Sequence, residues 1–193
     1  MRGRIAYSQE EMFERFIEEF NISGKKVLDI GGKLSSKSIA LLTCDKWISI
    51  DLNNANRVIN KHYEERKGDA RFLGFKDNEF DYIFSCNSFE HIYELEIALS
   101  EMYRVLKKGG ILYSNFGPIW SAPDGHHLDI KLENADLSFW KTNTIDLFEH
   151  LFSSEKEIKS RLEQKYGDEA SSKIMKAIFN SGWINRYNFE KYI

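Results

Sequence analysis

The sequence predicts an α/β protein in which helices cover both faces of a mostly parallel sheet. In the segment from Lys25 to Asp51, a short apolar run, two glycines, a helix-compatible stretch and a second apolar run follow one another. This strand, turn, helix, strand order is typical of a nucleotide-binding βαβ unit. The run from Phe80 to Cys86 is almost wholly apolar, as a strand covered on both faces must be. Glu94 to Leu106 has helical periodicity and precedes a further strand-like run, Ile111 to Phe116.

Composition favours one globular domain. The 193 residues are 42% hydrophobic and 30% charged, with a formal net charge of −3. That length allows a sizeable core, and the charge gives no general attraction to nucleic acids or anionic membranes. Cys44 and Cys86 lie in apolar surroundings and suggest buried thiols, which favours a cytoplasmic setting. No apolar run approaches the ~20 residues of a membrane-spanning helix, and the N-terminus lacks the apolar region of a signal peptide.

The remaining elements follow from local patterns. Ser8 to Phe20 predicts a helix, because Ser8 and Glu11 form a capping-box pattern before a run of helical periodicity. Lys107 to Gly110 combines cations with glycines, which is typical of the end of the preceding helix. Further helical segments are expected after a loop within 52–62, in a charged and aromatic stretch at 133–152, and at 154–165 and 168–180.

Polar residues gather where the predicted strands end. Gly31 and Gly32 let a ligand approach the backbone without a Cβ in the way, and a carboxylate at Asp51 can accept both ribose hydroxyls. A dinucleotide fingerprint would need glycines where this chain has Lys33 and Ser36, so that fingerprint fails. Asp29, just before the glycines, suits a cationic group such as an amino-acid ammonium better than a pyrophosphate. An adenosyl group that carries a methionine meets this demand.

Five motifs in this order resemble those of class I S-adenosylmethionine-dependent methyltransferases of the methyltransferase-11 type. They are Val27–Gly31, Asp51, Gly68-Asp69-Ala70 followed by Phe80–Ile83, Phe89–Ile92 and Arg104–Gly110. The resemblance covers roughly residues 25 to 116 and implies a Rossmann-like fold, a third strand at 63–67 and S-adenosylmethionine as the cofactor. The chain departs from the family at Lys33 and Ser35, where glycines are usual. The Lys33 side chain either crowds the cofactor or turns outward.

The resemblance also implies a set of cofactor-binding residues. Asp69, with the next backbone N–H, would read the adenine amine, although an ordinary loop aspartate is the alternative. Residues 86–91 stand at the carboxyl end of the strand at 80–86, where ligands of open α/β sheets bind, and should face the reacting methyl group. For His91, capping or packing of a helix is an equal alternative. The predicted set is Asp29, Gly31, Gly32, Lys33, Asp51, Leu52, Asp69, Ala70, Ser85, Cys86, Asn87 and His91. A helix before the first strand often closes over the cofactor in the resembled family, which would bring Tyr7 or Phe13 to it, but packing against the sheet is the favoured interpretation.

The segment from Gly117 to Asp129 contains both prolines and two adjacent histidines. A neutral imidazole that a carboxylate orients is a natural general base, so we predict His126 or His127 as the catalytic residue. An equal alternative is that both only hold the loop together. A metal site using these histidines and Glu90 is a minor alternative, because no ligand spacing supports it. Similar G-P-x-W and G-H-H stretches occur in methyltransferase-like proteins linked to bacterial surface-glycan gene sets, which is a looser resemblance.

We therefore predict one methyltransferase-like domain over 1–193, with an N-terminal helical cap at 1–24, a cofactor-binding core at 25–117 and an acceptor loop with a helical lid at 118–193. The predicted reaction is methyl transfer to a small polar acceptor, an oxygen of a nucleotide-linked sugar or its phosphoryl substituent, in polysaccharide biosynthesis.

Two alternatives stay open for the function. One is a catalytically inactive binding module of the same fold, and the other is a different Rossmann-type nucleotide or nicotinamide enzyme, which the failed glycine fingerprint disfavours. The expected partner is a small molecule rather than a nucleic acid or membrane, and a homo-oligomer is left open. The residues after Gly182 leave no room for the two last strands of the resembled fold, so we expect a truncated form.

Overall fold

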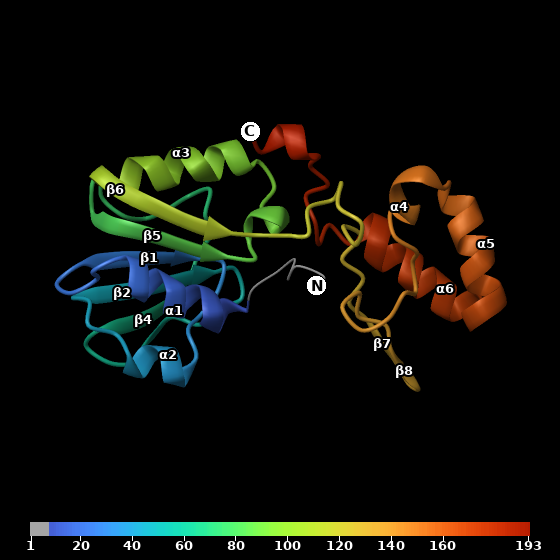
Figure 1. Cartoon of the computed structure of the whole chain (residues 1–193), viewed down its shortest axis with the longest axis horizontal. Coiled ribbons are helices and arrows are strands. Elements are labelled where there is room, and N and C mark those ends of the chain that lie inside the picture. The colour runs from blue at the N-terminus through green and yellow to red at the C-terminus, as the bar shows by residue number, and fades with distance from the viewer. Residues whose placement is uncertain (1–7) are drawn as a thin grey trace. The chain divides into compact units, whose positions relative to one another are not determined.

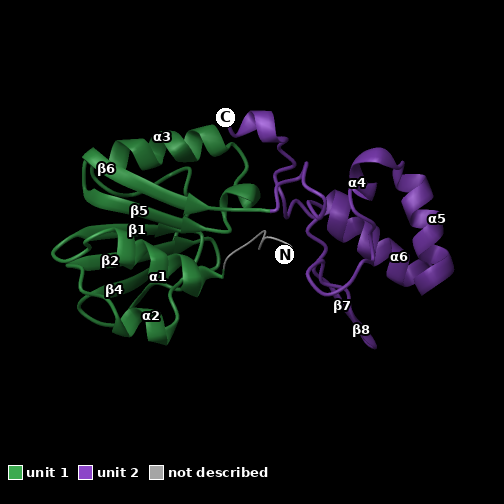
Figure 2. Ribbon diagram, viewed as in Figure 1, with its two compact units in different colours: residues 1–117 green, residues 118–193 purple. Residues whose placement is uncertain are grey.

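The computed structural model describes residues 8–193 and divides into two compact units (Figures 1 and 2). The N-terminal unit ends at Gly117 and the C-terminal unit begins at Pro118. Tyr7 lies outside the described residues. None of the helices within residues 8–193 combines the length and the apolar character that a membrane crossing requires.

A six-stranded sheet forms the centre of the N-terminal unit (Figure 1). Its strands stand in the order β3-β4-β2-β1-β5-β6, and every neighbouring pair is parallel except β3 with β4. Because parallel strands end at one edge of a sheet, the residues after β1, β2, β4 and β5 share that edge. The strands are β1 (Lys26–Ile30), β2 (Lys46–Asp51), β3 (Arg57–Val58), β4 (Tyr63–Lys67), β5 (Phe80–Cys86) and β6 (Leu106–Asn115). The predicted α/β fold with a mostly parallel sheet is confirmed.

Alternation along β1 explains how the sheet is covered on both faces. Side chains of a strand point alternately to its two faces, and Val27 joins the core cluster under α1 (Gln9–Glu19). In that cluster Phe16 packs edge-to-face against Trp47, with ring centroids 5.9 Å apart. Leu28 points to the other face and is also fully buried. The helix α3 (Leu95–Val105) packs beside β5 and β6 in the same unit (Figure 1). A short α2 (Ser36–Ala40) and a 3-10 helix, η1 (Phe89–His91), complete the unit.

Two local predictions in this unit are wrong. The segment 52–62 was expected to become a helix, but it forms turns and the two-residue strand β3. Its asparagines explain the difference, because Asn60 Oδ1 accepts from the backbone N–H of His62 and of Tyr63, each at 2.8 Å, and such bonds compete with helical ones. Lys107 to Gly110 does not end the helix, which stops at Val105. These residues bulge from the start of β6, where Phe80 pairs with Leu106 but Tyr82 pairs with Ile111.

The C-terminal unit has its own core. The expected helices at 154–165 and 168–180 are confirmed as α5 (Glu155–Tyr166) and as α6 (Asp168–Met175) continued by a π-helical turn, η2 (Lys176–Asn180). The prediction of a helical stretch at 133–152 is wrong. The stretch contains β8 (Ala135–Asp136), which forms a hairpin with the preceding β7 (Lys131–Leu132), then loops and only the short α4 (Glu149–Phe152). A 3-10 turn, η3, spans Phe189–Lys191. Polar side chains in the loops bind backbone groups that a helix would otherwise use. Asp136 Oδ1, for example, accepts from the N–H of Ser138.

Candidate functional site

The turn after β1 requires glycine at its first position. Gly31 has φ +83°, a conformation that L side chains rarely adopt, and a Cβ there would lie 2.2 Å from Ser88 Oγ. The Ser88 hydroxyl lies 3.0 Å from the carbonyl oxygens of Gly31 and Cys86. Ser88 therefore holds the end of β1 against the end of β5. Because Gly31 has no side chain, its backbone is what lies at this edge of the sheet.

The following residues keep the turn in place and leave its rim open. The carbonyl of Gly32 accepts from Asn54 Nδ2 at 3.1 Å, and the N–H of Leu34 donates to Tyr63 Oη at 2.8 Å. Lys33, which replaces the family's second glycine, is exposed. This exposure is compatible with a side chain that turns outward and leaves only its backbone beside the turn.

Asp29 lies directly below this turn and is fully buried. Its Oδ2 accepts from Ser49 Oγ at 2.6 Å and from Trp47 Nε1 at 3.4 Å, while Oδ1 has no hydrogen-bond partner among residues 8–193. Burial is the main cause that raises the pKa of Asp29 to about 6; the bonds from Ser49 and Trp47 oppose it and the charge of Asp51 adds to it. A buried carboxyl with one unused oxygen is a chemical fit for a cationic group.

Asp51 ends β2 at the same edge and is half-buried. Its Oδ1 accepts from the backbone N–H of Asn53 at 2.7 Å, which fixes the carboxylate at the start of the turn. The next residue, Leu52, exposes 60% of its surface. The arrangement leaves the carboxylate at the rim, where ribose hydroxyls could donate to it.

Asp69 follows β4 and is held by an arginine. Arg71 reaches both carboxylate oxygens, with Nη2 2.7 Å from Oδ2 and Nε 3.0 Å from Oδ1, and its Nη1 lies 2.6 Å from Glu94 Oε2. These bonds keep the pKa of Asp69 below its usual value. Asp69 therefore stays ionised as an acceptor, beside the half-buried Ala70.

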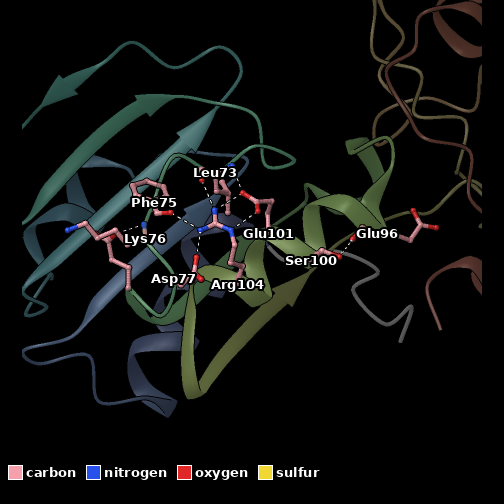
Figure 3. A network of polar contacts seen from close by, with 9 residues as sticks. Leu73, Phe75, Lys76, Asp77, Glu96, Ser100, Glu101 and Arg104 are labelled. Atoms are coloured by element: carbon pink, nitrogen blue, oxygen red, sulfur yellow. Dashed lines mark hydrogen bonds and ion pairs between the residues drawn. The ribbon is translucent and has the colours of Figure 1, made fainter.

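A second arginine fixes the rest of this loop (Figure 3). Arg104 of α3 donates to the carbonyls of Leu73 and Phe75, both at 2.8 Å, and pairs with Glu101 and Asp77. The N–H of Leu73 in turn donates to Glu101 at 2.9 Å. The arginine of the Arg104–Gly110 motif thus anchors the loop between β4 and β5.

The residues after β5 are mostly buried. The Ser85 hydroxyl donates to the Ile30 carbonyl at 3.0 Å, and burial raises the pKa of the Cys86 thiol to about 12, so the thiol stays protonated. Glu90 is fully buried, accepts from the N–H of Gly117 at 3.0 Å, and has its pKa raised by burial. Asn87 and His91 are half-buried, and Asn87 adopts φ +51°. Of the twelve predicted cofactor positions, Asp29, Ser85 and Cys86 are buried, and the other nine retain access to solvent.

His126 and His127 belong to the C-terminal unit, and both are buried. His126 Nδ1 accepts from the N–H of Leu128 at 3.1 Å. Burial, together with the nearby His150 and His127, lowers the pKa of His126 to about 3. His127 has φ +47° and hydrogen-bonds the Pro118 carbonyl through Nε2. Both imidazoles are engaged with the backbone of the loop that carries them. No group of three His, Cys, Asp or Glu residues within 8–193 has the arrangement of a metal site.

Sequence reasoning missed several residues that build the site. Ser49, Tyr63 and Ser88 hold Asp29 or the glycine turn, and Arg71 holds Asp69. A polar residue at Ser49 within an otherwise apolar strand was the available signal for the first of these. The others depend on strand register that no local pattern reveals.

Comparisons with known proteins agree with this geometry. Residues 28–114 match the family model described as a methyltransferase domain. A sterol 24-C-methyltransferase of Pneumocystis carinii is 33% identical over 105 residues, covering 48% of this chain and 28% of the relative. A ubiquinone/menaquinone biosynthesis C-methyltransferase of Allorhizobium ampelinum is 27% identical over 104 residues, covering 47% of this chain and 40% of the relative. The chain thus spans well under two thirds of the length of these curated relatives.

Solved structures give a weaker likeness. An N-methyltransferase 2 of Haemonchus contortus, solved with phosphomonomethylethanolamine and S-adenosylhomocysteine, aligns over 54% of this chain and 27% of that one, with a TM-score of 0.45 and 21% identity. The family match spans the segment that carries the glycine turn, Asp51, Asp69 and the Arg104 motif. The part of the chain that is similar to methyltransferase domains is therefore the part that carries the candidate site.

Proposed function

We propose that this chain binds S-adenosylmethionine and transfers its methyl group to an acceptor. The observation that carries the proposal is the glycine turn at Gly31 above the buried Asp29, whose Oδ1 has no partner among the described residues. When bound, the cofactor supplies an electrophilic methyl group on a sulfonium. Gly31 would admit it to the backbone and the Asp29 carboxyl would face its cationic part. Asp51 would accept from the ribose, and Asp69 from the adenine amine.

The acceptor that we propose is a small polar molecule, and more narrowly an oxygen of a nucleotide-linked sugar or its phosphoryl substituent. The polar loop that begins at Gly117 supports this class, through its similarity to proteins linked to surface glycans. The named relatives instead act on sterols and quinones, so an apolar acceptor is the competing outcome. We also propose a cytoplasmic setting, which the two free, buried cysteines support.

His126 or His127 as the base is a further part of the proposal. The base must be neutral and must reach the acceptor. The depressed pKa of His126 keeps its imidazole neutral, but the same burial makes it a weak base and keeps it from solvent. The contacts of both histidines support a loop-holding role better than proton transfer.

Calorimetry with S-adenosylhomocysteine tests the cofactor site. We expect the unmodified chain to bind S-adenosylhomocysteine at micromolar concentration and not to bind NAD. An Asp51→Ala variant, which lacks the ribose acceptor, should lose at least tenfold in affinity, or about 1.4 kcal/mol of binding free energy. Asp45→Ala, at an exposed position outside the turn, is the matched control and should bind like the unmodified chain. Absence of binding would reject the proposal in favour of an inactive module of the same fold, and preference for NAD would reject it in favour of another Rossmann-type enzyme.

A transfer assay tests the acceptor. The chain would be incubated with methyl-labelled S-adenosylmethionine and, separately, with nucleotide sugars, quinols and sterols. Label in a nucleotide sugar supports the proposed acceptor, and label in a quinol or sterol replaces it. Cofactor binding without transfer to any class would favour a non-catalytic binding module.

A further inference from the structure

A continuous chain of hydrogen bonds crosses the buried face of the sheet below the glycine turn. The N–H of Leu34 donates to Tyr63 Oη at 2.8 Å, and that hydroxyl lies 3.1 Å from Ser49 Oγ. The Ser49 hydroxyl donates to Asp29 Oδ2 at 2.6 Å. Tyr63, Ser49 and Asp29 are each fully buried and belong to the adjacent strands β4, β2 and β1.

The direction of this chain follows from the number of protons. A serine hydroxyl has one proton, and Ser49 gives it to the Asp29 carboxylate. The contact between Tyr63 and Ser49 must then use the tyrosine proton, which leaves the tyrosine oxygen to accept from Leu34. Every donor points toward Asp29, so a negative charge on Asp29 polarises each hydrogen bond of this series.

We propose that Ser49 and Tyr63 are positioning residues that couple the charge on Asp29 to the backbone of the glycine turn. The proposal deepens the proposed cofactor site and rests on it. An ionised Asp29 fixes the hydroxyl protons in one direction and holds the N–H of Leu34, three residues after Gly31. A protonated Asp29 can act as a donor itself, so the direction is no longer enforced and the turn loses part of its anchorage. Binding of a cation beside Asp29 and ordering of the turn therefore support each other.

Few other groups near Asp29 titrate in the relevant range. The titratable neighbours of this series of bonds are Asp51 at the end of β2, Cys86 on β5, and Tyr63 and Glu65 on β4. Glu65 is buried and pairs with Arg57. Burial raises the pKa of Cys86 and of Tyr63 to about 12, so neither changes charge between pH 5 and pH 8. The α1 helix contributes only apolar side chains to this core, namely Met12, Phe13 and Phe16. Glu90, whose pKa burial also raises, acts on Cys86, so the transition of Asp29 has to be followed at its own carboxyl carbon.

NMR of the ligand-free chain tests the coupling without any cofactor. The carboxyl carbon of Asp29 and the amide of Leu34 would be followed from pH 4.5 to pH 8.5. We expect both signals to titrate with one midpoint. In Ser49→Ala the midpoint should rise by about one pH unit, because the carboxylate loses a donor. In Tyr63→Phe the Leu34 amide should stop following Asp29, while the aromatic ring still fills its place.

Two matched controls remove a hydroxyl outside the chain of bonds. Ser114→Ala deletes a buried hydroxyl of β6 that has no partner among the described residues. Tyr82→Phe deletes the Tyr82 hydroxyl of β5, which donates to the backbone carbonyl of Asn21 at 3.5 Å. Neither should alter the two titrations. An unchanged Asp29 midpoint in Ser49→Ala, or a Leu34 amide that still follows Asp29 in Tyr63→Phe, would overturn the inference.

Binding of S-adenosylhomocysteine adds a second readout. Affinity should rise as the pH passes the Asp29 midpoint, and Tyr63→Phe should bind several-fold more weakly with a flatter pH profile. Loss through general instability would instead weaken binding equally at all pH values. If the unmodified chain binds none of this ligand, the proposed function fails, whereas the ligand-free titrations still decide whether the coupling exists.

Discussion

At the scale of the residue, Asp29 combines complete burial with an incomplete set of hydrogen bonds. Its Oδ1 is unpartnered among the described residues, while Oδ2 accepts from Ser49 and Trp47. A buried, ionised carboxylate with an unused oxygen is costly. The position is therefore easier to explain as part of a binding site for a cation than as part of a core.

Replacing Asp29 with asparagine should make the ligand-free chain relatively more stable at high pH. The pKa of Asp29 is about 6 when folded and 3.8 in the reference state. The free energy of unfolding is therefore highest below about pH 4, where Asp29 is protonated. It falls by about 3 kcal/mol in all as the pH rises through 6. Urea unfolding at pH 4.5 and pH 8 measures the effect, with Asp45→Asn as an exposed control. If the free energies of unfolding of Asp29→Asn and the unmodified chain differ by the same amount at both pH values, this prediction is wrong.

Gly31→Ala should abolish cofactor binding and destabilise the fold. The positive φ costs about 1–2 kcal/mol for a residue with a Cβ, and the contact with Ser88 adds to this. A Gly24→Ala variant is the matched control, because Gly24 also has positive φ but open space around it. Thermal unfolding should show a larger loss for Gly31→Ala, and equal losses would argue against the steric role of Ser88.

At the scale of the element, α3 fixes the loop that carries the candidate adenine-binding residues. Arg104 binds two carbonyls and two carboxylates at once (Figure 3). Its planar guanidinium suits this arrangement, whereas a lysine would make a single point contact. The loop between β4 and β5 therefore depends on a helix that follows it in the sequence.

Arg104→Lys should loosen that loop although the charge is kept. We expect faster amide hydrogen exchange at Leu73, whose N–H donates to Glu101 of the same network, and weaker binding of S-adenosylhomocysteine. Lys76→Arg, at an exposed position of the loop, serves as the control. Unchanged exchange at Leu73 in Arg104→Lys would show that the backbone alone holds the loop.

Local patterns predicted the elements that carry an apolar run, helical periodicity or a capping residue. The helix capped by Ser8, the central strands β1, β2 and β5, and α3 all agree with expectation. The segment 52–62 and the residues Lys107 to Gly110 do not, because asparagine side chains and a bulge against β5 decide their structure. Similarly, Ser88 and Tyr63 became visible as parts of the site only once distant segments were brought together. Gly31 and Ser88 are 57 residues apart in the chain.

At the scale of the whole molecule, the chain has two units with separate cores. The family match and the candidate cofactor site lie in the N-terminal unit. The C-terminal unit holds the buried histidines and a loop in which His127, His150 and Phe148 bind three backbone carbonyls, those of Pro118, Trp120 and Pro123. The C-terminal unit is therefore built around a constrained loop.

The C-terminal unit should lose stability as the solution becomes acidic. His126 has a pKa of about 3 when folded and 6.5 in the reference state, so the unfolded chain binds the proton first and stability falls as the pH drops below about 6.5. The His126→Asn variant should show a flatter dependence between pH 7.5 and pH 4.5. Chemical unfolding followed by near-UV circular dichroism measures it, and a parallel dependence in both proteins would contradict the assignment.

The contact between Trp47 and Asp29 gives the N-terminal unit an optical reporter. Trp47 is fully buried, its indole N–H points at the Asp29 carboxyl, and the other three tryptophans, at positions 120, 140 and 183, lie in the C-terminal unit. A charge that appears or is neutralised on that carboxyl changes the electric field across the indole. In a chain whose other tryptophans are replaced by phenylalanine, the colour and intensity of the remaining fluorescence would follow the ionisation of Asp29 directly. The same emission would then register the arrival of a cationic ligand in a stopped-flow instrument without any attached dye.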